Sequence, residues 1–295
     1  MRIFVTGANG WVGSAVVQEL LAAGHQVLGL VRSEAAAHKL AATGATPLHG
    51  ALGDLDSLRR GAEQADGIIH TAFGLDLADI PKSSAEEKQA IELFGEVFIG
   101  SDRPVIVTSG LGFTAPGQLI TEAAPPFVIP NFPRDPEQVV GAIVARGGRA
   151  TVVRLPRTVH GAQEQHGFMP MLIRAAREKG VSAYVGDGQN LWPAVHRLDA
   201  ARVFCLALEH GAQGGPFHAV AEQGVPFKAI AEAIGQLLRL PVVSQSPEEA
   251  AAHFGPIAMF VAGNGPAASE QTRTRLGWQP AQPDLLADLA NYTVR

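Results

Sequence analysis

The chain has 295 residues, of which 46% are hydrophobic and 17% charged, so it can bury a large core and is neither disordered nor fibrous. Its 23 basic and 28 acidic residues give a formal net charge of -5 without long blocks of either sign. A nucleic-acid-binding or anionic-membrane-binding surface would need a basic patch, and no apolar run reaches the roughly 20 residues that span a bilayer. We therefore expect a cytoplasmic protein with a small-molecule substrate, no nucleic-acid or membrane partner, and a homodimer if it self-associates.

Cys205 is the only cysteine. A single thiol excludes an intrachain disulfide framework and a zinc site built from several thiolates. Its apolar neighbours Phe204 and Leu206 predict a buried core thiol. The ten histidines show no metal-ligand spacing, so the sequence predicts no metal site.

The chain starts as a strand, a glycine-rich turn and a helix. Residues 2–6 (RIFVT) are a short apolar run, and residues 7–13 (GANGWVG) lead into an amphipathic helix. In a dinucleotide-binding turn, Gly7 would make the sharp bend, Gly10 would let a pyrophosphate approach the backbone, and Gly13 would let the helix pack on the strand. The helix N-terminus would then face the phosphates. The alternative is a glycine-rich turn without a ligand.

A second strand, residues 26–31, completes a βαβ unit and is followed by Arg32 and Ser33. NAD-selective sites carry an acidic residue near this point, which binds the ribose hydroxyls. An arginine instead favours the 2′-phosphate of NADP, and Ser33 can add a hydroxyl donor. The alternative is a solvated Arg32 with Ser33 as the cap of the next helix.

The alternation of strands and helices continues to about residue 108. We predict strands at 45–49, 67–70 and 104–108, and helices at 54–63 and 84–99. Ser83 and Ser84, each three residues before a glutamate, predict overlapping capping boxes for the helix at 84–99. This order is typical of a parallel, doubly wound sheet, in which ligands bind beyond the carboxyl ends of the strands.

The rest of the chain is predicted to form a smaller lobe. We expect helices at 168–179, 227–238 and 247–260, a further helix capped by Asp199 and ending at 210, and a strand at 216–220. The predicted fold is α/β, a Rossmann-type doubly wound parallel sheet with a smaller C-terminal substrate lobe. Residues 1–155 would form the NADP-binding domain, and residues 156–295 mostly the substrate lobe, with segments returning to the Rossmann domain.

Several short motifs occur in the order found in one enzyme family. They are TGANGWVG at 6–13, Thr71-Ala72-Phe73, Val107-Thr108-Ser109, Arg154-Leu155-Pro156 with Thr158-Val159-His160-Gly161, and Val195-His196-Arg197-Leu198-Asp199. Together they resemble the extended or atypical short-chain dehydrogenases/reductases, the NAD-dependent epimerase/dehydratase-like group. The resemblance covers most of the chain.

The resemblance implies a bound nicotinamide dinucleotide and assigns residues to it by motif, and Arg32 with Ser33 makes NADP(H) the expected cofactor. The glycine turn would hold the pyrophosphate, the segment after residue 70 the nicotinamide ribose, and Pro156 the nicotinamide face. The cofactor-binding residues expected in this way are Gly7, Asn9, Gly10, Trp11, Val12, Gly13, Arg32, Ser33, Ala51, Leu52, Thr71, Ala72, Phe73, Thr108 and Pro156.

Two positions depart from the family pattern. Where the family has Gly-Asp-Leu for the adenine, this chain has Ala51 before Leu52, so only the backbone and Leu52 are left for that contact. The Tyr-x-x-x-Lys motif is absent, because the only tyrosines are Tyr184 and Tyr292, and no lysine lies between residues 88 and 179. In its place stands the segment 131–138. There Asp135 is the expected N-cap of a helix over 139–146, and Arg134 lies at the mouth of the site.

Three side chains are the expected catalytic groups. Ser109 matches the family's strand-end serine, which polarises the substrate carbonyl. Arg134 would supply positive charge or bind a substrate anion, and His160 would supply a proton, with His166 and His196 as weaker candidates. The sequence predicts an NADP(H)-dependent oxidoreductase that transfers hydride to or from a small, mostly apolar carbonyl-type substrate. The alternatives are a non-catalytic NADP(H)-binding redox sensor and an NAD(P)-dependent epimerase or dehydratase.

Overall fold

The structure is a computed structural model that describes residues 1–293 except 75–78, 129–132, 163 and 166. Residues 131–132 of the predicted segment 131–138 and His166 therefore lie outside the described residues. No helix in the described part of the chain is long and apolar enough to cross a membrane.

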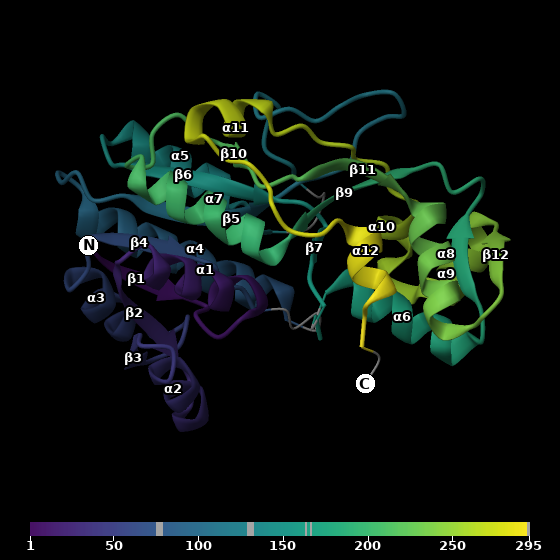
Figure 1. Cartoon of the computed structure of the whole chain (residues 1–295). Helices are drawn as coiled ribbons and strands as arrows, with labels where there is room; N and C mark the ends of the chain where they lie inside the picture. The colour runs from purple at the N-terminus through teal and green to yellow at the C-terminus, as the bar shows by residue number, and fades with distance from the viewer. Residues whose placement is uncertain (75–78, 129–132, 163, 166, 294–295) are drawn as a thin grey trace.

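Seven parallel strands form the main sheet (Figure 1). Their order is β10-β6-β5-β4-β1-β2-β3. The chain runs from β1 outward to β3 and then returns to the other side of β1 with β4, so the order reverses between β1 and β4. In open parallel sheets the ligand crevice lies outside the carboxyl ends at such a reversal. The strands are β1 (Arg2–Thr6), β2 (Gln26–Val31), β3 (Thr46–His49), β4 (Gly67–His70), β5 (Val105–Gly110), β6 (Ala150–Leu155) and β10 (Phe217–His218).

Helices cover both faces of this sheet. Alternate strand residues point to opposite sides, and apolar side chains on each side are buried by helices. Ile3 and Val5 pack in one apolar core with α1 (Trp11–Ala22) and α7 (Arg197–Glu209), whereas Phe4 packs in another. The first core also includes residues of α2 (Glu34–Ala41). The second includes residues of α3 (Leu55–Glu63), α4 (Ile80–Phe98) and α5 (Pro136–Ala145).

The C-terminal part forms a separate apolar core, and two of its segments return to the main sheet. Strand β10 pairs with β6, and α7 packs against α1. The described residues also form two small sheets, β11-β9-β7 and β12-β8. Their strands are β7 (Thr158–His160), β8 (Ser182–Val185), β9 (Leu191–His196), β11 (Glu222–Pro226) and β12 (Val242–Gln245). The remaining helices are α6 (Phe168–Lys179), α8 (Phe227–Leu238), α9 (Pro247–Phe254), the 3-10 helix Gly255–Ile257, α10 (Ala258–Ala262), α11 (Glu270–Leu276) and α12 (Leu285–Ala290).

The bounds of β2, β4, α6 and α8 are those predicted, and three expectations are wrong. Helix α4 begins at Ile80, so Ser83 and Ser84 are buried inside it and do not cap it. Helix α7 is capped by the imidazole of His196, which accepts a hydrogen bond from the Leu198 amide, not by Asp199. The predicted helix over 247–260 is broken at Gly255, whose φ of 55° lies in the left-handed region.

The core predicts opposite effects for two helical glycines. A Cβ at Gly61 of α3 would lie 2.4 Å from the Phe4 ring, whereas a Cβ at Gly141 of α5 meets nothing within 4 Å. Gly61→Ala should lower the free energy of unfolding by about 1–3 kcal/mol through overpacking. Gly141→Ala should raise it by about 0.5–1 kcal/mol through helix propensity. Urea denaturation of both variants tests this, and equal shifts would contradict the packing of α3 on β1.

Candidate functional site

The glycine turn after β1 packs directly on the segment after β4. Gly7 has a φ of 72°, and a Cβ there would lie 2.7 Å from Thr71 Oγ1 and 2.9 Å from the Ala72 nitrogen. A Cβ at Gly13 would lie 2.1 Å from the Gly7 carbonyl oxygen, so no larger residue fits at either position. Gly10 occupies the N-cap position of α1, and no side chain caps this helix in the described structure. These open amide groups beside side-chain-free backbone fit a pyrophosphate.

Hydroxyl groups join the carboxyl ends of β1, β4 and β5. Thr71 Oγ1 donates to the Thr6 carbonyl at 2.8 Å, and Thr108 Oγ1 donates to the His70 carbonyl at 2.9 Å. His70 Nδ1 lies 2.8 Å from Thr6 Oγ1, and burial, with Arg134 nearby, lowers the pKa of His70 to about 3. His70 is therefore neutral and structural. The hydroxyls of Thr71 and Thr108 are engaged within the protein, which leaves backbone groups to face a cofactor.

The end of β2 presents one exposed cation. Arg32 is exposed and has no hydrogen-bond or ion-pair partner in the described parts of the chain. Ser33 Oγ accepts a hydrogen bond from the Ala36 amide at 3.3 Å, so the serine does cap α2. Asn9 of the glycine turn donates to the Ala36 carbonyl at 3.1 Å. The start of α2 is thus fixed beside the turn, with Arg32 free to contact a phosphate.

The predicted adenine side is apolar. The carbonyl of Ala51 accepts a hydrogen bond from the Asp54 amide at 3.0 Å, and Asp54 caps α3. Leu52 packs against the core of the second face. The side chains of Ala51 and Leu52 therefore offer van der Waals contact but no hydrogen-bond acceptor.

Trp11 connects the glycine turn to the C-terminal part. Its Nε1 donates to the Val159 carbonyl of β7 at 2.7 Å, and the Arg197 guanidinium lies 4.4 Å from its ring centroid. A Cβ at Gly161 would lie 3.0 Å from the same ring. The next residue, Val12, packs against the first core. The indole thus fixes β7 against the turn, so the cofactor contact predicted for Trp11 falls to its backbone.

Ser109, at the end of β5, belongs to a buried charged network that sequence analysis missed. Its Oγ donates to Glu137 Oε1 at 2.7 Å. Glu137, in the first turn of α5, also accepts two hydrogen bonds from Arg154 of β6, at 2.9 and 2.7 Å. Arg154 also contacts β10, because its Nη1 donates to Nε2 of His218 at 3.3 Å. The available signal was Arg154 itself, a charge inside an otherwise apolar strand.

Arg134 also has a buried carboxylate partner. Its Nε and Nη2 donate to the two carboxylate oxygens of Glu87 in α4, at 2.8 and 2.7 Å. Nη2 also donates to the Thr108 carbonyl at 3.1 Å, and the guanidinium lies 4.6 Å from the Phe73 ring centroid. Burial raises the pKa of Glu87, and the charge and hydrogen bonds of Arg134 oppose that rise. Much of the arginine's positive charge is thus balanced within the protein.

The N-cap of α5 is the predicted one. Asp135 caps α5 by accepting a hydrogen bond from the Gln138 amide at 3.1 Å, with Pro136 as the first helical residue. Neither of the two tyrosines belongs to this helix or to a neighbouring element of the chain. Tyr184 lies in β8, and Tyr292 follows α12. Pro156, the expected nicotinamide-side residue, is buried between β6 and β7.

His160 lies in a different cluster from Ser109 and Arg134. It is 2% exposed, and its Nδ1 lies 2.6 Å from Asp288 Oδ2 of α12. Its Nε2 lies 3.7 Å from Glu222 Oε2 of β11, and His196 Nε2 lies 3.8 Å from Asp288 Oδ2. Burial lowers the pKa of His196. In the described contacts, Ser109 and Arg134 are linked only through β5: Ser109 belongs to this strand, and Arg134 donates to its Thr108 carbonyl. His160 is instead held to α12 by Asp288.

Comparisons with known proteins agree with this geometry. Residues 7–123 match the NAD(P)H-binding family, and residues 137–220 match the NAD dependent epimerase/dehydratase family. An uncharacterized protein of Schizosaccharomyces pombe is 49% identical over 99% of this chain and 99% of its own length. A 4-hydroxy-2-methyl-3-oxo-4-farnesyl-3,4-dihydroquinoline-1-oxide ketoreductase of Stigmatella aurantiaca is 32% identical over 72% of this chain and 66% of its own.

A solved structure of a human epimerase family protein with NADPH has a TM-score of 0.72 at 20% identity, covering 98% of both chains. That likeness concerns the fold. The chain belongs to the NAD(P)H-binding proteins of the NAD-dependent epimerase/dehydratase family, the extended short-chain dehydrogenases/reductases. Its ligand is accordingly a nicotinamide dinucleotide, NAD(P)(H), for which the turn at Gly7 to Gly13 provides the fitting cradle.

Glu164, beside the His160 cluster, predicts a pH dependence of stability. It is 5% exposed, and burial together with the nearby charge of Asp288 raises its pKa to about 9 from 4.5. The unfolded chain loses this proton at lower pH than the folded chain does, so stability falls as pH rises from about 4.5 to about 9. Each pH unit in this window costs up to about 1.4 kcal/mol. Glu164→Gln should remove that loss, as measured by urea denaturation at about pH 5 and about pH 7.

The exposed Glu232 of α8 offers the matched control, because its side chain faces solvent. Glu232→Gln should leave the pH dependence as it is in the unmodified protein. If Glu164→Gln also leaves it unchanged, the carboxyl of Glu164 is not protonated in the folded state.

Proposed function

We propose that this protein is an NADP(H)-dependent oxidoreductase that transfers hydride to or from a small, mostly apolar carbonyl-type substrate. The observation that carries the proposal is the glycine cradle at the reversal between β1 and β4, with the exposed Arg32 beyond β2 on one side and Ser109 of β5 on the other. The ketoreductase named above is a relative with carbonyl chemistry, which supports the choice of substrate class.

Different residues of the site would bind different parts of the cofactor. The amides from Gly10 to Gly13 would hold the pyrophosphate, while Asn9 orders the turn. Arg32, aided by Ser33, would pair with the 2′-phosphate, because a free guanidinium binds phosphate through charge-assisted hydrogen bonds. The nicotinamide would lie on the side of Thr71, Ala72, Phe73, Thr108 and Pro156. When bound, the nicotinamide supplies or accepts the hydride.

Ser109 would polarise the substrate carbonyl. Its proton now points to Glu137, so the hydroxyl must turn toward the substrate oxygen to donate there. Arg154 keeps two hydrogen bonds to Glu137 when this happens, so the carboxylate stays paired. The cost of the rotation is one hydrogen bond. A donor placed in this way stabilises the negative charge that develops on the oxygen during hydride transfer.

Arg134 and His160 would act less directly than the sequence suggested. Arg134 is held by Glu87 and contacts the Thr108 carbonyl, so it would orient the end of β5 and add a modest positive field. His160 is buried against Asp288, which favours water as the proton source for the product alcohol.

A cavity that follows β5 suits an apolar substrate. It has a volume of about 500 Å³ and lies within the segment 112–127 that begins three residues after Ser109. Its lining includes Phe113, Ile120 and Phe127, and the rings of Phe113 and Phe127 meet edge to face at 5.4 Å. Thr114 and Gln118 add polar groups to this mostly apolar lining, so the cavity would select a compact, weakly polar carbonyl compound.

A second candidate is a redox sensor that binds NADP(H) without turnover. It is favoured because two of the predicted catalytic side chains are engaged within the protein: Ser109 donates to Glu137, and Arg134 is paired with Glu87. An epimerase or dehydratase is disfavoured, because those reactions need a free general base and the carboxylate of α5, Glu137, is held by Arg154. Turnover of NADPH with an aldehyde and ketone panel separates the reductase from the sensor.

Cofactor choice is tested by reversing the charge at the end of β2. Arg32→Glu should weaken NADPH binding by roughly 10- to 100-fold, because a charge-assisted hydrogen bond of about 1.5–3 kcal/mol is replaced by repulsion. NADH binding should change much less. Titration calorimetry with both cofactors measures the two effects, and the exposed Arg174 of α6 supplies the control variant Arg174→Glu. Equal weakening of both cofactors would refute the 2′-phosphate contact.

The polarising role is tested by removing one hydroxyl. Ser109→Ala should lower kcat by up to about 100-fold, or about 3 kcal/mol, and leave the Kd for NADPH nearly intact. Steady-state kinetics on a substrate of the panel and calorimetry with NADPH give the two readouts. Unchanged turnover would remove Ser109 from the mechanism.

A further inference from the structure

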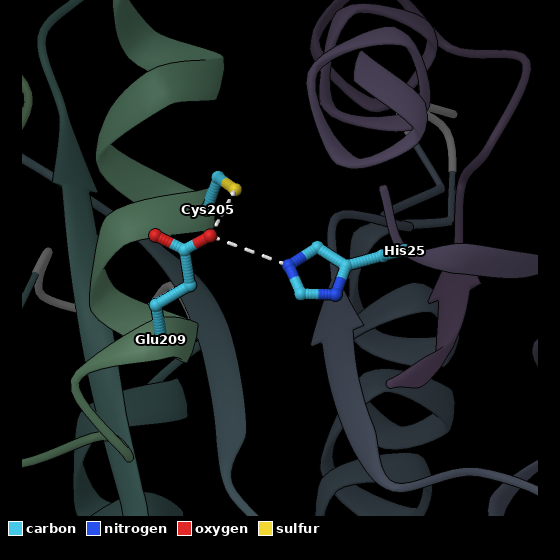
Figure 2. Close-up of side chains that lie close together, drawn as sticks. All are labelled: His25, Cys205 and Glu209. Atoms are coloured by element: carbon cyan, nitrogen blue, oxygen red, sulfur yellow. Dashed lines mark hydrogen bonds and ion pairs between the residues drawn. The ribbon is translucent and has the colours of Figure 1, made fainter. Parts of the chain in front are cut away.

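Three potential metal-ligating side chains meet near the amino ends of the main-sheet strands, whereas the cofactor cradle lies at their carboxyl ends. His25 directly precedes β2, so it lies at the amino end of a parallel strand, whereas the cradle lies at the carboxyl ends. Cys205 and Glu209 belong to α7, and Figure 2 shows both side chains turned toward the imidazole of His25. No sequence motif marks this cluster, because His25 and Glu209 are 184 residues apart.

The spacing of the ligand atoms is close to that of a tetrahedral metal site. His25 Nε2 lies 3.3 Å from Glu209 Oε1, and Cys205 Sγ lies 3.7 Å from the same oxygen. All three ligand atoms lie within 4.8 Å of one another. Zinc bonds of about 2.0–2.3 Å in a tetrahedron place neighbouring ligand atoms about 3.3–3.6 Å apart. Two edges of the triangle are therefore near their final lengths before any metal binds.

The backbone holds these ligands in place. Cys205 and Glu209 are four residues apart on α7, so they share one helix face. Cys205 is fully buried, the side chain of His25 is 11% exposed, and that of Glu209 is 35% exposed. His25 Nδ1 lies 3.5 Å from the amino nitrogen of Met1. The exposed side of Glu209 leaves room for water as a fourth ligand, which is the pattern of an open three-ligand site.

The charges around the thiol favour a cation. Burial raises the pKa of Cys205 to about 12, and the carboxylates of Glu209 and Glu19 act in the same direction, opposed by Arg202. The thiol donates its proton to Glu209 Oε1, 3.7 Å from Sγ. A divalent cation would balance one thiolate and one carboxylate, so that the buried group carries no net charge.

We propose that His25, Cys205 and Glu209 form a binding site for one divalent cation of the zinc class. Binding releases the thiol proton to solvent. The imidazole binds through Nε2 and carries its proton on Nδ1, so the Met1 ammonium, whose nitrogen lies 3.5 Å from Nδ1, turns away from it on binding. No electron is transferred. The metal would join α7 to the start of β2, so its effect would be on stability and it would take no part in hydride transfer.

Cobalt(II) is a suitable probe, because a bond between cobalt and thiolate gives a charge-transfer absorption in the near ultraviolet. The full chain, freed of metal with a chelator, is titrated with cobalt chloride. We expect this absorption to saturate at one equivalent and to disappear on addition of zinc. Zinc should also raise Tm. No charge-transfer band, or no saturation at one equivalent, would overturn the proposal.

Two variants assign the ligands, and a third serves as a control. Cys205→Ser should abolish the charge-transfer band, and His25→Asn, which leaves the thiol in place, should weaken cobalt binding by more than about tenfold. His38→Asn, at an exposed position of α2, should change nothing. If His25→Asn binds cobalt as tightly as the unmodified protein, the three residues form only an ion pair with a nearby thiol. NADPH binding is measured separately, so either result leaves the proposed function untouched.

Discussion

Two buried pairs of arginine and carboxylate fix the carboxyl end of β5, and the geometry of the candidate site depends on them. Glu87 and Arg134 hold the Thr108 carbonyl from the side of α4, while Glu137 and Arg154 hold the Ser109 hydroxyl from the side of α5 and β6. Breaking one such pair leaves an uncompensated buried charge, at a cost of about 3–5 kcal/mol. The two pairs therefore hold the backbone that carries Ser109 from both of its neighbouring layers.

The Rossmann half of the chain could be predicted because its signals are local. The apolar run and glycine turn at the N-terminus, the strand 26–31 and the strand 67–70 all depend on residues within a few positions of one another. The start of α4 could not be predicted in the same way. Ser84 and Glu87 fit a capping box by spacing, but Glu87 is buried because Arg134, 47 residues later, pairs with it.

The candidate site shows the same division. Residue types and motifs predicted Gly7, Arg32 and Ser109 as site residues, and all three lie at or just beyond the carboxyl ends of their strands. Their partners could not be found, because each lies far along the chain: Glu137 is 28 residues from Ser109, and Asp288 is 128 residues from His160. A carboxylate on a distant helix decides whether a histidine or serine is free, and no local pattern encodes that distance.

The return of β10 to the outer side of β6 has a consequence for how the protein is made. The main sheet is incomplete until Phe217 and His218 have been synthesised, and the face that α7 covers stays exposed until residue 209. The Trp278 indole then donates to the Asp199 carbonyl at the start of α7, which secures this helix still later. The nucleotide-binding half therefore cannot finish folding on the ribosome ahead of the rest. A chain cut after β6 would leave the ribosome with an open sheet edge and an uncovered apolar face, a form prone to aggregate.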